Sequence, residues 1–495
     1  MYLAAYCFAA VMVLAVPLGL KSIWRARRIL VFIYFVILLA STAWVVYEAI
    51  DMRKLLLAVA SSAALYQFFN IYRALKSSLN SEHLRQITFR SALRLFILSA
   101  ILLAVALLVN RFDPSFNQSL SIAIISYLLG LILLASVWSN LAYVPEKIGE
   151  TLPVESGRLP TLSVAIPARN ETESLYYCLK SLLGSNYPKL EILVLDDNSS
   201  DKRTPEIIRS FAHDGVIFIA GKPYGETWLA KNRAYQQLLE AANGEYILFC
   251  GADTRFSKDA LHQLVGYQTK SNHLMLSVMP FNTLPNQLKD RFLQPLRYVW
   301  EVGLPRRSLK RPAVLSTCWL IKRDFVSKLG GFKGVSRRVS PESYFAKKAF
   351  ALKSYSFFQY QGLVSQKDTS SELETLIRLR YPQLRRQTES VFLASLIEIT
   401  TILGPILILI LAIINHHYLV FLFAALTYLF YSTAFYMLAK LCYHSKSLWS
   451  FLLWPYYVAL DLIIMNLSMW RYELGVVLWK GRSIAPSVMG VELKS

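Results

Sequence analysis

The chain has 495 residues, of which 55% are hydrophobic and 17% are charged, and its 53 basic and 32 acidic side chains give a formal net charge of +21. Soluble domains carry about 25% charged residues, so this composition excludes an ordinary soluble enzyme, and the charge that remains excludes a chain that lies wholly in a membrane. Five cysteines exclude a disulfide scaffold, and 13% aromatic residues exclude disorder. We therefore expect separate membrane and soluble parts.

The apolar residues gather in two clusters of runs, each run close to the roughly 20 residues of a membrane-spanning helix. Five runs precede residue 145 and three follow Glu389, with none of that length between them. The runs are Tyr2–Leu20, Ile29–Ala49, Leu55–Tyr72, Leu95–Val109, Leu120–Tyr143, Val391–Ile414, Tyr418–Leu438 and Leu448–Trp470. This layout predicts a transmembrane region of about five helices over residues 1–144, a central domain over residues 145–388, and a second transmembrane region of two or three helices, with a tail, over residues 389–495.

Basic residues between the runs predict the orientation, because cytoplasmic loops carry an excess of lysine and arginine. Basic clusters follow the first run and separate the third from the fourth. We therefore expect a multi-pass protein of the cell membrane with an external N-terminus and a cytoplasmic central domain. The last run contains Pro455, Asp461 and Asn466, which leaves open whether it crosses the membrane, re-enters it or lies at its interface. Glu398 and Asp461 lie within apolar runs, where an acid is either functional or solvated near the interface.

Strand and helix patterns alternate along the central domain. Short apolar runs that end in proline or acidic residues predict strands, and leucines three or four residues apart predict helices. In chain order we expect a strand at Leu162–Pro167, a helix at Ser174–Leu183, a strand at Leu190–Leu195, a helix at Pro205–His213, a strand at Val216–Ala220, a helix at Ala230–Ala242 and a strand at Glu245–Cys250. This alternation predicts an α/β domain with a mostly parallel sheet, helices on both faces, and ligands beyond the carboxyl ends of the strands.

Three stretches of this domain, Ser163–Glu171, Tyr187-Pro188 and Val194–Asp201, resemble the nucleotide-binding half of family 2 glycosyltransferases. The resemblance implies the GT-A fold and an inverting, hexosyltransferase-type enzyme that uses a nucleotide-sugar donor. Trp228 followed by Lys231-Asn232 is similar to the membrane-bound subgroup that glycosylates hopanoid, carotenoid or ceramide-type lipids, which implies a membrane lipid acceptor. The resemblance continues through Gly221-Lys222-Pro223, Gly244–Phe249, Gly330-Gly331-Phe332 and Trp479-Lys480-Gly481-Arg482.

The resemblance assigns donor contacts to a set of polar residues and one proline. Asp196 and Asp197 end a strand, where a carboxylate can accept hydrogen bonds from a base N–H or a ribose hydroxyl. The same Asp-Asp-Asn-Ser sequence also forms turns without any ligand. Lys231 either neutralises phosphate or lies on a solvated helix face, and both interpretations stay open. The donor-binding candidates are Pro167, Arg169, Glu171, Asp196, Asp197, Lys231, Asp253, Gln383 and Arg386.

Asp253 stands at the place of the second Asp of the family's Asp-x-Asp motif, so the resemblance implies that it holds Mg²⁺ or Mn²⁺ on the donor diphosphate. A hard cation suits this place because negative charge builds up on the leaving nucleoside diphosphate. Gly251 replaces the first Asp of the motif, which predicts a weaker or altered metal site. The alternative is that Asp253 is a turn residue at a strand end.

Glu342 is the candidate catalytic base. Inversion needs a group that takes the proton from the acceptor hydroxyl while the sugar carbon is attacked opposite the leaving group. The family places a Glu-Asp pair before a helix, and by that alignment Glu342 takes the place of the Asp and Pro341 that of the Glu. The alternative is an acid that stabilises a helix N-terminus, which favours negative charge.

The family's Gln-x-x-Arg-Trp motif becomes Gln383-Leu384-Arg385-Arg386-Gln387 in this chain. The resemblance implies that the arginine pairs with the diphosphate, which suits a side chain that forms two parallel hydrogen bonds. Replacement of the tryptophan by Gln387 removes stacking at this place. The alternative is that the basic run contacts anionic lipid headgroups.

These observations favour an inverting glycosyltransferase that moves a sugar from a nucleotide-sugar donor to a membrane-associated acceptor. The changes at Gly251, Pro341 and Gln387 keep a second hypothesis open, a catalytically degenerate relative that binds a nucleotide sugar or serves as a scaffold. A transporter is disfavoured because the apolar runs carry few polar residues and the chain shows no phosphate-binding glycine loop of the ATPase kind. No nucleic-acid-binding module is recognised, so we expect the positive charge to face lipid headgroups and the donor.

Overall fold

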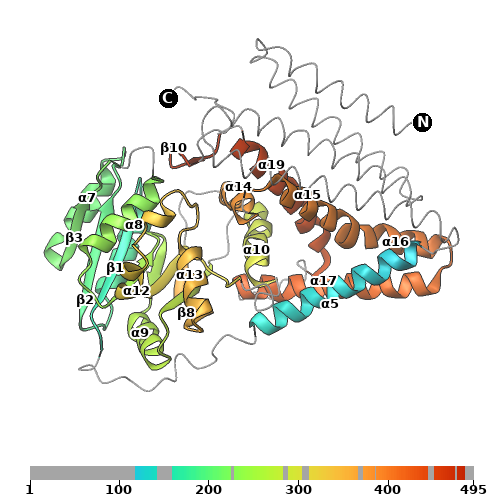
Figure 1. The fold of residues 1–495 in the computed structure, drawn as a ribbon, viewed down its shortest axis with the longest axis horizontal. Helices are drawn as coiled ribbons and strands as arrows, with labels where there is room; N and C mark the ends of the chain where they lie inside the picture. Colours follow the sequence, from blue (N-terminus) through green and yellow to red (C-terminus); the bar gives the residue numbers. More distant parts are fainter. Residues whose placement is uncertain are drawn as a thin grey trace, which may run out of the picture.

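The computed structural model describes residues 118–141, 159–223, 228–282, 288–303, 311–365, 372–384, 386–443, 451–473 and 476–484. The first four predicted membrane runs, which end at Val109, lie outside these residues. The described residues form an α/β domain around one large sheet and a group of long helices beside it (Figure 1). Two of these helices, α10 (Leu288–Val302) and α14 (Glu372–Gln383), lie between the sheet and the rest of the helical part (Figure 1).

The large sheet has eight strands: β1 Leu162–Ala168, β2 Leu190–Asp196, β3 Val216–Ala220, β4 Tyr246–Cys250, β5 Thr254–Phe256, β6 Met275–Asn282, β7 Cys318–Lys322 and β8 Tyr355–Ser365. Their order is β3-β2-β1-β4-β7-β6-β8-β5. Strands β1 to β4 pair in parallel, and each overlaps one of the four predicted strands. Strand β7 pairs antiparallel with both β4 and β6, and β5 pairs antiparallel with β8. The sheet is therefore mixed, which corrects the expectation of a mostly parallel sheet in its second half.

Strands β1 and β2 are buried on both faces, because side chains that alternate along each strand enter two separate cores. Val164 and Ile192 pack into one core, and their neighbours Ala165 and Leu193 pack into the other. This double burial explains why the strands read as continuous apolar runs. The predicted cover on both faces is confirmed: α6 (Glu173–Leu183), α7 (Arg203–Ser210) and α9 (Ala260–Lys270) lie on the first face, and α8 (Ala230–Ala241), α12 (Arg323–Lys328) and α13 (Glu342–Ala351) on the second.

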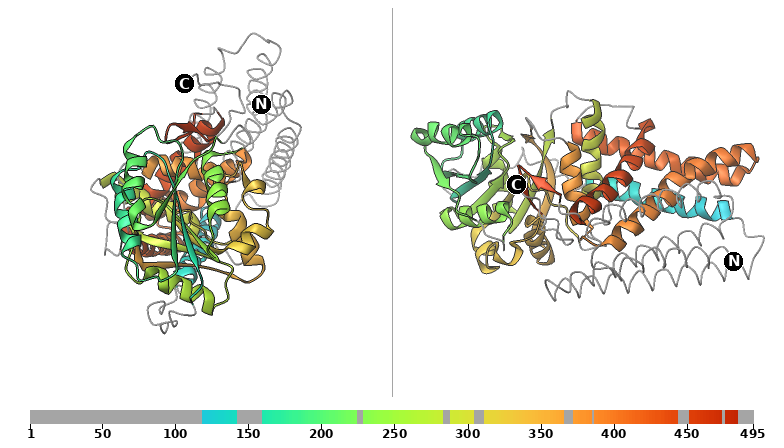
Figure 2. Two further views of the ribbon diagram at one scale, coloured as in Figure 1. Left: turned by 90° about the vertical axis from the view of Figure 1, so that its left-hand side faces the viewer. Right: turned by 90° about the horizontal axis from the view of Figure 1, so that it is seen from above.

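The helical part brings together segments from both ends of the chain. Besides α10 and α14 it comprises α5 (Gln118–Leu141), α15 (Thr388–Ile397), the π-helical segment η4 (Glu398–Leu403), α16 (Gly404–Ile414), α17 (Tyr418–Tyr443) and α19 (Trp454–Glu473). Helix α5 packs along α17, as the cyan and orange ribbons show in Figures 1 and 2. The contact between α10 and α17 links this bundle to the helices that border the sheet.

Within the described residues, one helix is long and apolar enough to cross a membrane, the segment Tyr418–Lys440 of α17 with a mean hydropathy of 1.7. Shorter apolar helices at Ala123–Val137 and Gly404–Ile414 pack against α17. Large apolar side chains on α16 and α17 are exposed, among them Ile414 at 64% and Leu419 at 65%. A contiguous apolar surface of this kind indicates contact with lipid or with another protein. The larger number of spans that the sequence predicts stays a prediction.

A buried ion pair joins α14 to α19. The Nε atom of Arg380 lies 2.6 Å from Oδ1 of Asp461, and the two side chains are 1% and 4% exposed. Trp300 of α10 donates its indole N–H to Oδ2 of Asp461 at 2.7 Å, and Arg380 also donates to the carbonyl oxygen of Leu296. Asp461 is therefore a buried partner of Arg380 that ties three helices together.

We expect Asp461→Ala to destabilise the protein by about 3–5 kcal/mol, because it leaves the guanidinium of Arg380 buried without its counter-charge. The ion pair of Arg471 with Glu374 joins the same two helices at the surface, with side chains 34% and 56% exposed. Arg471→Ala should change stability by about 1 kcal/mol or less. Thermal unfolding of the purified full-length variants measures both effects, and equal shifts in the two unfolding midpoints would contradict the assigned role of the buried pair.

Candidate active site

The carboxyl ends of β1, β2 and β4 lie together at one edge of the sheet. Ala168 at the end of β1 pairs with Asp196 at the end of β2, and β4 pairs with the other side of β1. Asn170 links the loops that follow β1 and β2, because its Oδ1 atom accepts hydrogen bonds from the backbone N–H groups of Ser200 at 2.9 Å and Asp201 at 3.2 Å. Asn170 has a φ of 49°, in the left-handed region that asparagine adopts more readily than most residues.

A cavity of about 610 Å³ opens at this edge, between the sheet and helices α10 and α14. Its volume falls within the ~300–1,000 Å³ of small-molecule sites. Four predicted site residues line it: Pro167 and Glu171 after β1, Lys231 at the start of α8, and Asp253 after β4. The predicted residues that are not part of its wall are Arg169, Asp196, Asp197, Glu342, Gln383 and Arg386.

Asp196 and Asp197 are engaged by other residues of the chain. The Oδ1 atom of Asp196 accepts hydrogen bonds from the hydroxyl of Ser199 at 2.5 Å and from its backbone N–H at 3.2 Å. This is the kind of turn that the Asp-Asp-Asn-Ser sequence forms without a ligand. Asp197 is buried, and its Oδ2 atom accepts a hydrogen bond from Nη1 of Arg482 at 2.7 Å. Burial raises the pKa of the Asp197 carboxyl, and its hydrogen bond with Arg482 opposes that shift.

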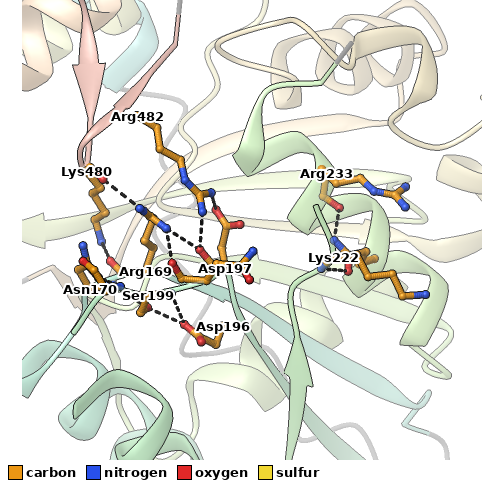
Figure 3. A network of polar contacts seen from close by, with 12 residues as sticks. Arg169, Asn170, Asp196, Asp197, Ser199, Lys222, Arg233, Lys480 and Arg482 are labelled. Carbon is orange, nitrogen blue, oxygen red and sulfur yellow. Dashed lines mark hydrogen bonds and ion pairs between the residues drawn. The ribbon is translucent and has the colours of Figure 1, made fainter. Parts of the chain in front are cut away.

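A short C-terminal hairpin, formed by β9 (Leu478–Trp479) and β10 (Arg482–Ser483), returns to the edge of the sheet where the site lies (Figure 3). In its turn, Lys480 donates hydrogen bonds to the carbonyl oxygen of Arg169 at 2.7 Å and to the carboxylate of Glu171. Arg169 in return donates from Nε to the carbonyl oxygen of Lys480 at 3.2 Å. Arg169 therefore holds the hairpin against the loops.

Glu342 begins α13 and is 3% exposed. Burial raises the pKa of its carboxyl, whereas the positive charge of Lys231 and a hydrogen bond with Ser340 lower that pKa. The Oε2 atom of Glu342 is buried and has no hydrogen-bond partner among the described residues. Because Lys231 and Ser340 both line the cavity, Glu342 lies immediately behind its wall. A buried acid with a specific charge partner beside a cavity is typical of a functional site.

The start of α8 organises this region. Asn232 is fully buried, and its Nδ2 group donates to three carbonyl oxygens of the loop 335–338 at 2.8 to 2.9 Å, which fixes the segment that leads to α13. The Nζ atom of Lys231 lies 5.1 Å from the ring centre of Tyr235. Burial lowers the pKa of Lys231, and the negative charge of Glu342 opposes that shift. Lys231 is thus a partly enclosed cation of the cavity wall.

Asp253 is the candidate metal ligand, and its carboxylate lies over Gly251. A Cβ atom at position 251 would meet Oδ1 of Asp253 well inside van der Waals contact. Within the described residues, no group of three or more His, Cys, Asp and Glu side chains could hold a metal ion. Mg²⁺ is commonly bound by one or two carboxylates together with substrate phosphates. Asp253 therefore fits a cation that it shares with donor phosphates, and the described residues build no site from protein ligands alone.

Gln383 and Arg386 lie at the end of α14, away from the cavity. The Oε1 atom of Gln383 accepts a hydrogen bond from Arg380 at 3.1 Å, on the side of α14 that faces the helical part. The guanidinium carbon of Arg386 lies 5.1 Å from the ring centre of Tyr472. The cavity instead receives Arg378 from the opposite side of α14. The donor role predicted for Gln383 and Arg386 stays a prediction.

Further cationic residues line the cavity without being identified as site residues by the sequence. They are Arg297 of α10, Arg378 of α14, and Lys480 and Arg482 of the hairpin. The motif Trp479-Lys480-Gly481-Arg482 is a sequence signal for the hairpin, since it resembles the family. The arginines of α10 and α14 carry no local signal, because tertiary packing alone brings these helices to the sheet edge.

Comparison with known proteins identifies relatives of the central domain. The sequence profile of Glycosyl transferase family 2 matches residues 163–330. The probable glycosyltransferase YdaM of Bacillus subtilis is 31% identical over 183 residues, which cover 35% of this chain and 43% of that protein. The 4,4'-diaponeurosporenoate glycosyltransferase of Staphylococcus aureus is 32% identical over 124 residues, which cover 25% of this chain and 32% of that protein. This chain therefore spans less than half of the length of these curated relatives.

Among solved structures, the mannosyltransferase PcManGT of Pyrobaculum calidifontis in complex with GDP-Man and Mn²⁺ is 18% identical, with a TM-score of 0.44 over 71% of this chain and 99% of that chain. The family profile extends from β1 to beyond β7, so it covers Asp253 and Lys231. Glu342, α14 and the C-terminal hairpin lie outside that match.

We expect Mn²⁺ binding by the full-length protein to depend on a nucleoside diphosphate, because Asp253 offers a single carboxylate. Electron paramagnetic resonance of free Mn²⁺ should show no more binding to the wild type than to Asp253→Asn when the ion is added alone. With UDP or GDP added, the wild type should bind the ion at least about tenfold more tightly than the variant, as expected for losing one charged ligand. Tight, stoichiometric Mn²⁺ binding without nucleotide would contradict this account.

Proposed function

We propose that this chain, whose residues 163–330 form a Glycosyl transferase family 2 domain, is an inverting glycosyltransferase that moves a sugar from a nucleotide-sugar donor to a lipid acceptor at the membrane. The observation that carries the proposal is the environment of Glu342. Its carboxylate is buried behind the cavity wall, beside Lys231, with one oxygen atom that no described residue uses. A helix-stabilising acid needs no such burial, since exposed acids also stabilise helix N-termini.

In the proposed reaction, Glu342 acts as the base. The acceptor hydroxyl gives its proton to the unpaired Oε2 atom, which it reaches when Lys231 and Ser340 in the cavity wall move aside, as its oxygen attacks the anomeric carbon of the sugar. The bond from that carbon to the diphosphate oxygen breaks on the opposite face, and its electron pair leaves with the nucleoside diphosphate. Attack opposite the leaving group inverts the configuration at the anomeric carbon.

The positive charge of the cavity suits the leaving group. Lys231, Arg297 and Arg378 come from three helices and all line the cavity. Cations placed where negative charge develops stabilise the transition state, and a water-poor site makes each of them more effective. When bound with the donor, Mg²⁺ or Mn²⁺ at Asp253 would neutralise further charge on the diphosphate.

Three observations support a membrane-associated acceptor. Helices α16 and α17 expose large apolar side chains, and α17 contains the segment Tyr418–Lys440 that could span a membrane. The cavity is bordered by α10 and α14, which pack against the same bundle, so an acceptor in the membrane surface would lie close to it. The similarity to a relative named 4,4'-diaponeurosporenoate glycosyltransferase is consistent with a lipid acceptor. We place the protein at the cell membrane with this domain on the cytoplasmic side.

Transfer of labelled sugar tests the function directly. Purified full-length protein is incubated with a panel of UDP- and GDP-sugars, Mn²⁺ or Mg²⁺, and a bacterial lipid extract, and the organic phase is assayed for label. We expect a glycolipid whose anomeric configuration is opposite to that of the donor. Donor binding without transfer to any lipid would support the degenerate relative that Gly251, Pro341 and Gln387 suggest. A product with retained configuration would contradict the mechanism.

Glu342→Gln should lower kcat by about 10²–10⁴-fold, the usual contribution of a general base, because the amide cannot take the proton. Donor affinity should change little, since Glu342 lies behind the cavity wall. Initial rates at saturating donor measure the effect. Glu342→Asp, which keeps the carboxylate but shortens its reach, should retain part of the activity. A Glu342→Gln enzyme with wild-type kcat would exclude this residue as the base.

Lys231→Met should move the acidic limb of the pH profile of kcat to higher pH. The base works only when ionised, and the positive charge of Lys231 lowers the pKa of Glu342. Its removal raises that pKa further, so activity is lost earlier as the pH falls. Lys258→Ala, which removes an exposed lysine outside the cavity, serves as the control. An acidic limb that does not move in Lys231→Met would show that the two groups are not coupled.

A further inference from the structure

The C-terminal hairpin is a wall of the cavity that the proposed donor would enter. Its residues Leu478, Trp479, Lys480 and Arg482 line the cavity, although they lie outside the family match. The hairpin also contacts α14 on the opposite wall, where the guanidinium carbon of Arg378 lies 5.8 Å from the ring centre of Trp479. The hairpin thus bridges the loops after β1 and β2 and the helices that border the sheet.

The turn of the hairpin holds its lysine in an unusual conformation. Trp479 pairs with Arg482, so the turn has two residues, and both have positive φ: 48° at Lys480 and 79° at Gly481. Such turns favour asparagine or glycine at both places, and a lysine in the left-handed region costs energy. A strained backbone conformation persists where surrounding contacts hold it in place, and such conformations are common at ligand sites. Here the contacts of Lys480 with Arg169 and Glu171 impose it.

The charges around the cavity favour a multiply charged anion. Five cationic side chains from four separate elements line it: Lys231, Arg297, Arg378, Lys480 and Arg482. The acidic side chains in the same wall are Glu171, Asp253 and Glu374. Arg482 has only 15% of its side chain exposed, so its guanidinium is itself largely shielded from water. Charge-assisted hydrogen bonds to phosphate are strong in such surroundings.

We propose that the C-terminal hairpin is part of the donor site and that Lys480 and Arg482 bind the donor's diphosphate group at its second phosphate, the one bonded to the sugar. Both side chains already face the cavity while each keeps a carboxylate partner, Glu171 and Asp197. A guanidinium has five N–H donors and an ammonium three, so both can hold a phosphate oxygen in addition. These cations supply positive charge at a site where Gly251 stands in place of the first Asp of the family's Asp-x-Asp motif. The inference rests on the proposed use of a nucleotide-sugar donor.

Calorimetric titration of the full-length protein tests the assignment with UDP, GDP, UMP and GMP as probes. One of the two diphosphates, UDP or GDP, should bind the wild type. Its Kd should rise at least about tenfold in Arg482→Ala and in Lys480→Met, as expected for losing one charge-assisted hydrogen bond. The matching monophosphate should lose less than about threefold, because the contact is to the second phosphate. Arg482→Lys should recover part of the loss, and Lys258→Ala should leave all four affinities unchanged.

A double-mutant cycle separates contact with the ligand from a purely structural clasp. If Arg482 only holds Asp197 in place, Arg482→Ala, Asp197→Asn and the double variant should weaken diphosphate binding by the same factor. If Arg482 contacts phosphate, the double variant should bind more weakly than either single variant. Thermal unfolding of each variant identifies any that fail to fold, and Arg482→Lys then provides the comparison.

The outcomes are distinct. Equal loss of monophosphate and diphosphate binding, or no loss in either hairpin variant, would overturn the assignment of Lys480 and Arg482 while leaving the proposed function standing. A wild-type protein that binds neither UDP nor GDP would contradict the proposed function itself. Selective loss of diphosphate binding with an additive double-mutant cycle is the result that the inference predicts.

Discussion

The cavity depends on a contact between two residues that lie 285 positions apart in the chain. Nη1 of Arg482 lies 2.7 Å from Oδ2 of Asp197, and Nη2 donates to the carbonyl oxygen of Asp197 at 3.1 Å. This contact, with that of Lys480 to Glu171, holds the hairpin at the edge of the sheet, where the hairpin forms one wall of the cavity. Asp197 directly follows β2, and its contact with Arg482 anchors the last described segment of the chain.

Burial has a direct electrostatic effect on the acid behind the cavity wall. Glu342 is buried, which raises the pKa of its carboxyl, and the positive charge of Lys231 on the cavity side opposes that shift. Cations of the cavity wall that are shielded from water, such as Arg482, likewise interact more strongly with an anion, because charges interact more strongly where water is scarce. The proposed reaction removes a proton from the acceptor and releases a diphosphate. A base of raised pKa serves the first step, and a cluster of cations serves the second. The ion pair of Arg380 with Asp461 contributes indirectly, since it fixes the helix that carries Arg378.

Much of the sheet could be predicted from the sequence, and the reason is local. Strands β1, β2 and β4 are buried on both faces, so each reads as an apolar run, and the edge strand β3 is apolar although it is partly exposed. Strand β7 is as buried and as apolar as these. Strands β5, β6 and β8 include polar residues or proline and lie in the half of the sheet that pairs partly antiparallel, so their presence follows from the tertiary fold. The metal and base candidates, Asp253 and Glu342, were identifiable because they follow or precede regular elements at motif positions.

The remaining site residues could not be predicted because a motif gives positions along a helix and not the side that faces the ligand. On α14, Thr375 and Arg378 face the cavity, whereas Arg380 and Gln383 face the helical part, as the helical period dictates. The cations of α10 and of the hairpin reach the site through packing between distant segments. The sequence therefore predicts the chemistry of the domain better than the complete list of its contacts.

Hydrogen–deuterium exchange of the full-length protein, with and without Mn²⁺ and UDP or GDP, tests most directly whether this cavity binds the donor. We expect one of these nucleotides to slow exchange together in the loops 168–171 and 251–254, the start of α8, and the hairpin 478–483. Slower exchange confined to other surfaces, or faster exchange in the hairpin when a nucleotide binds, would contradict this expectation.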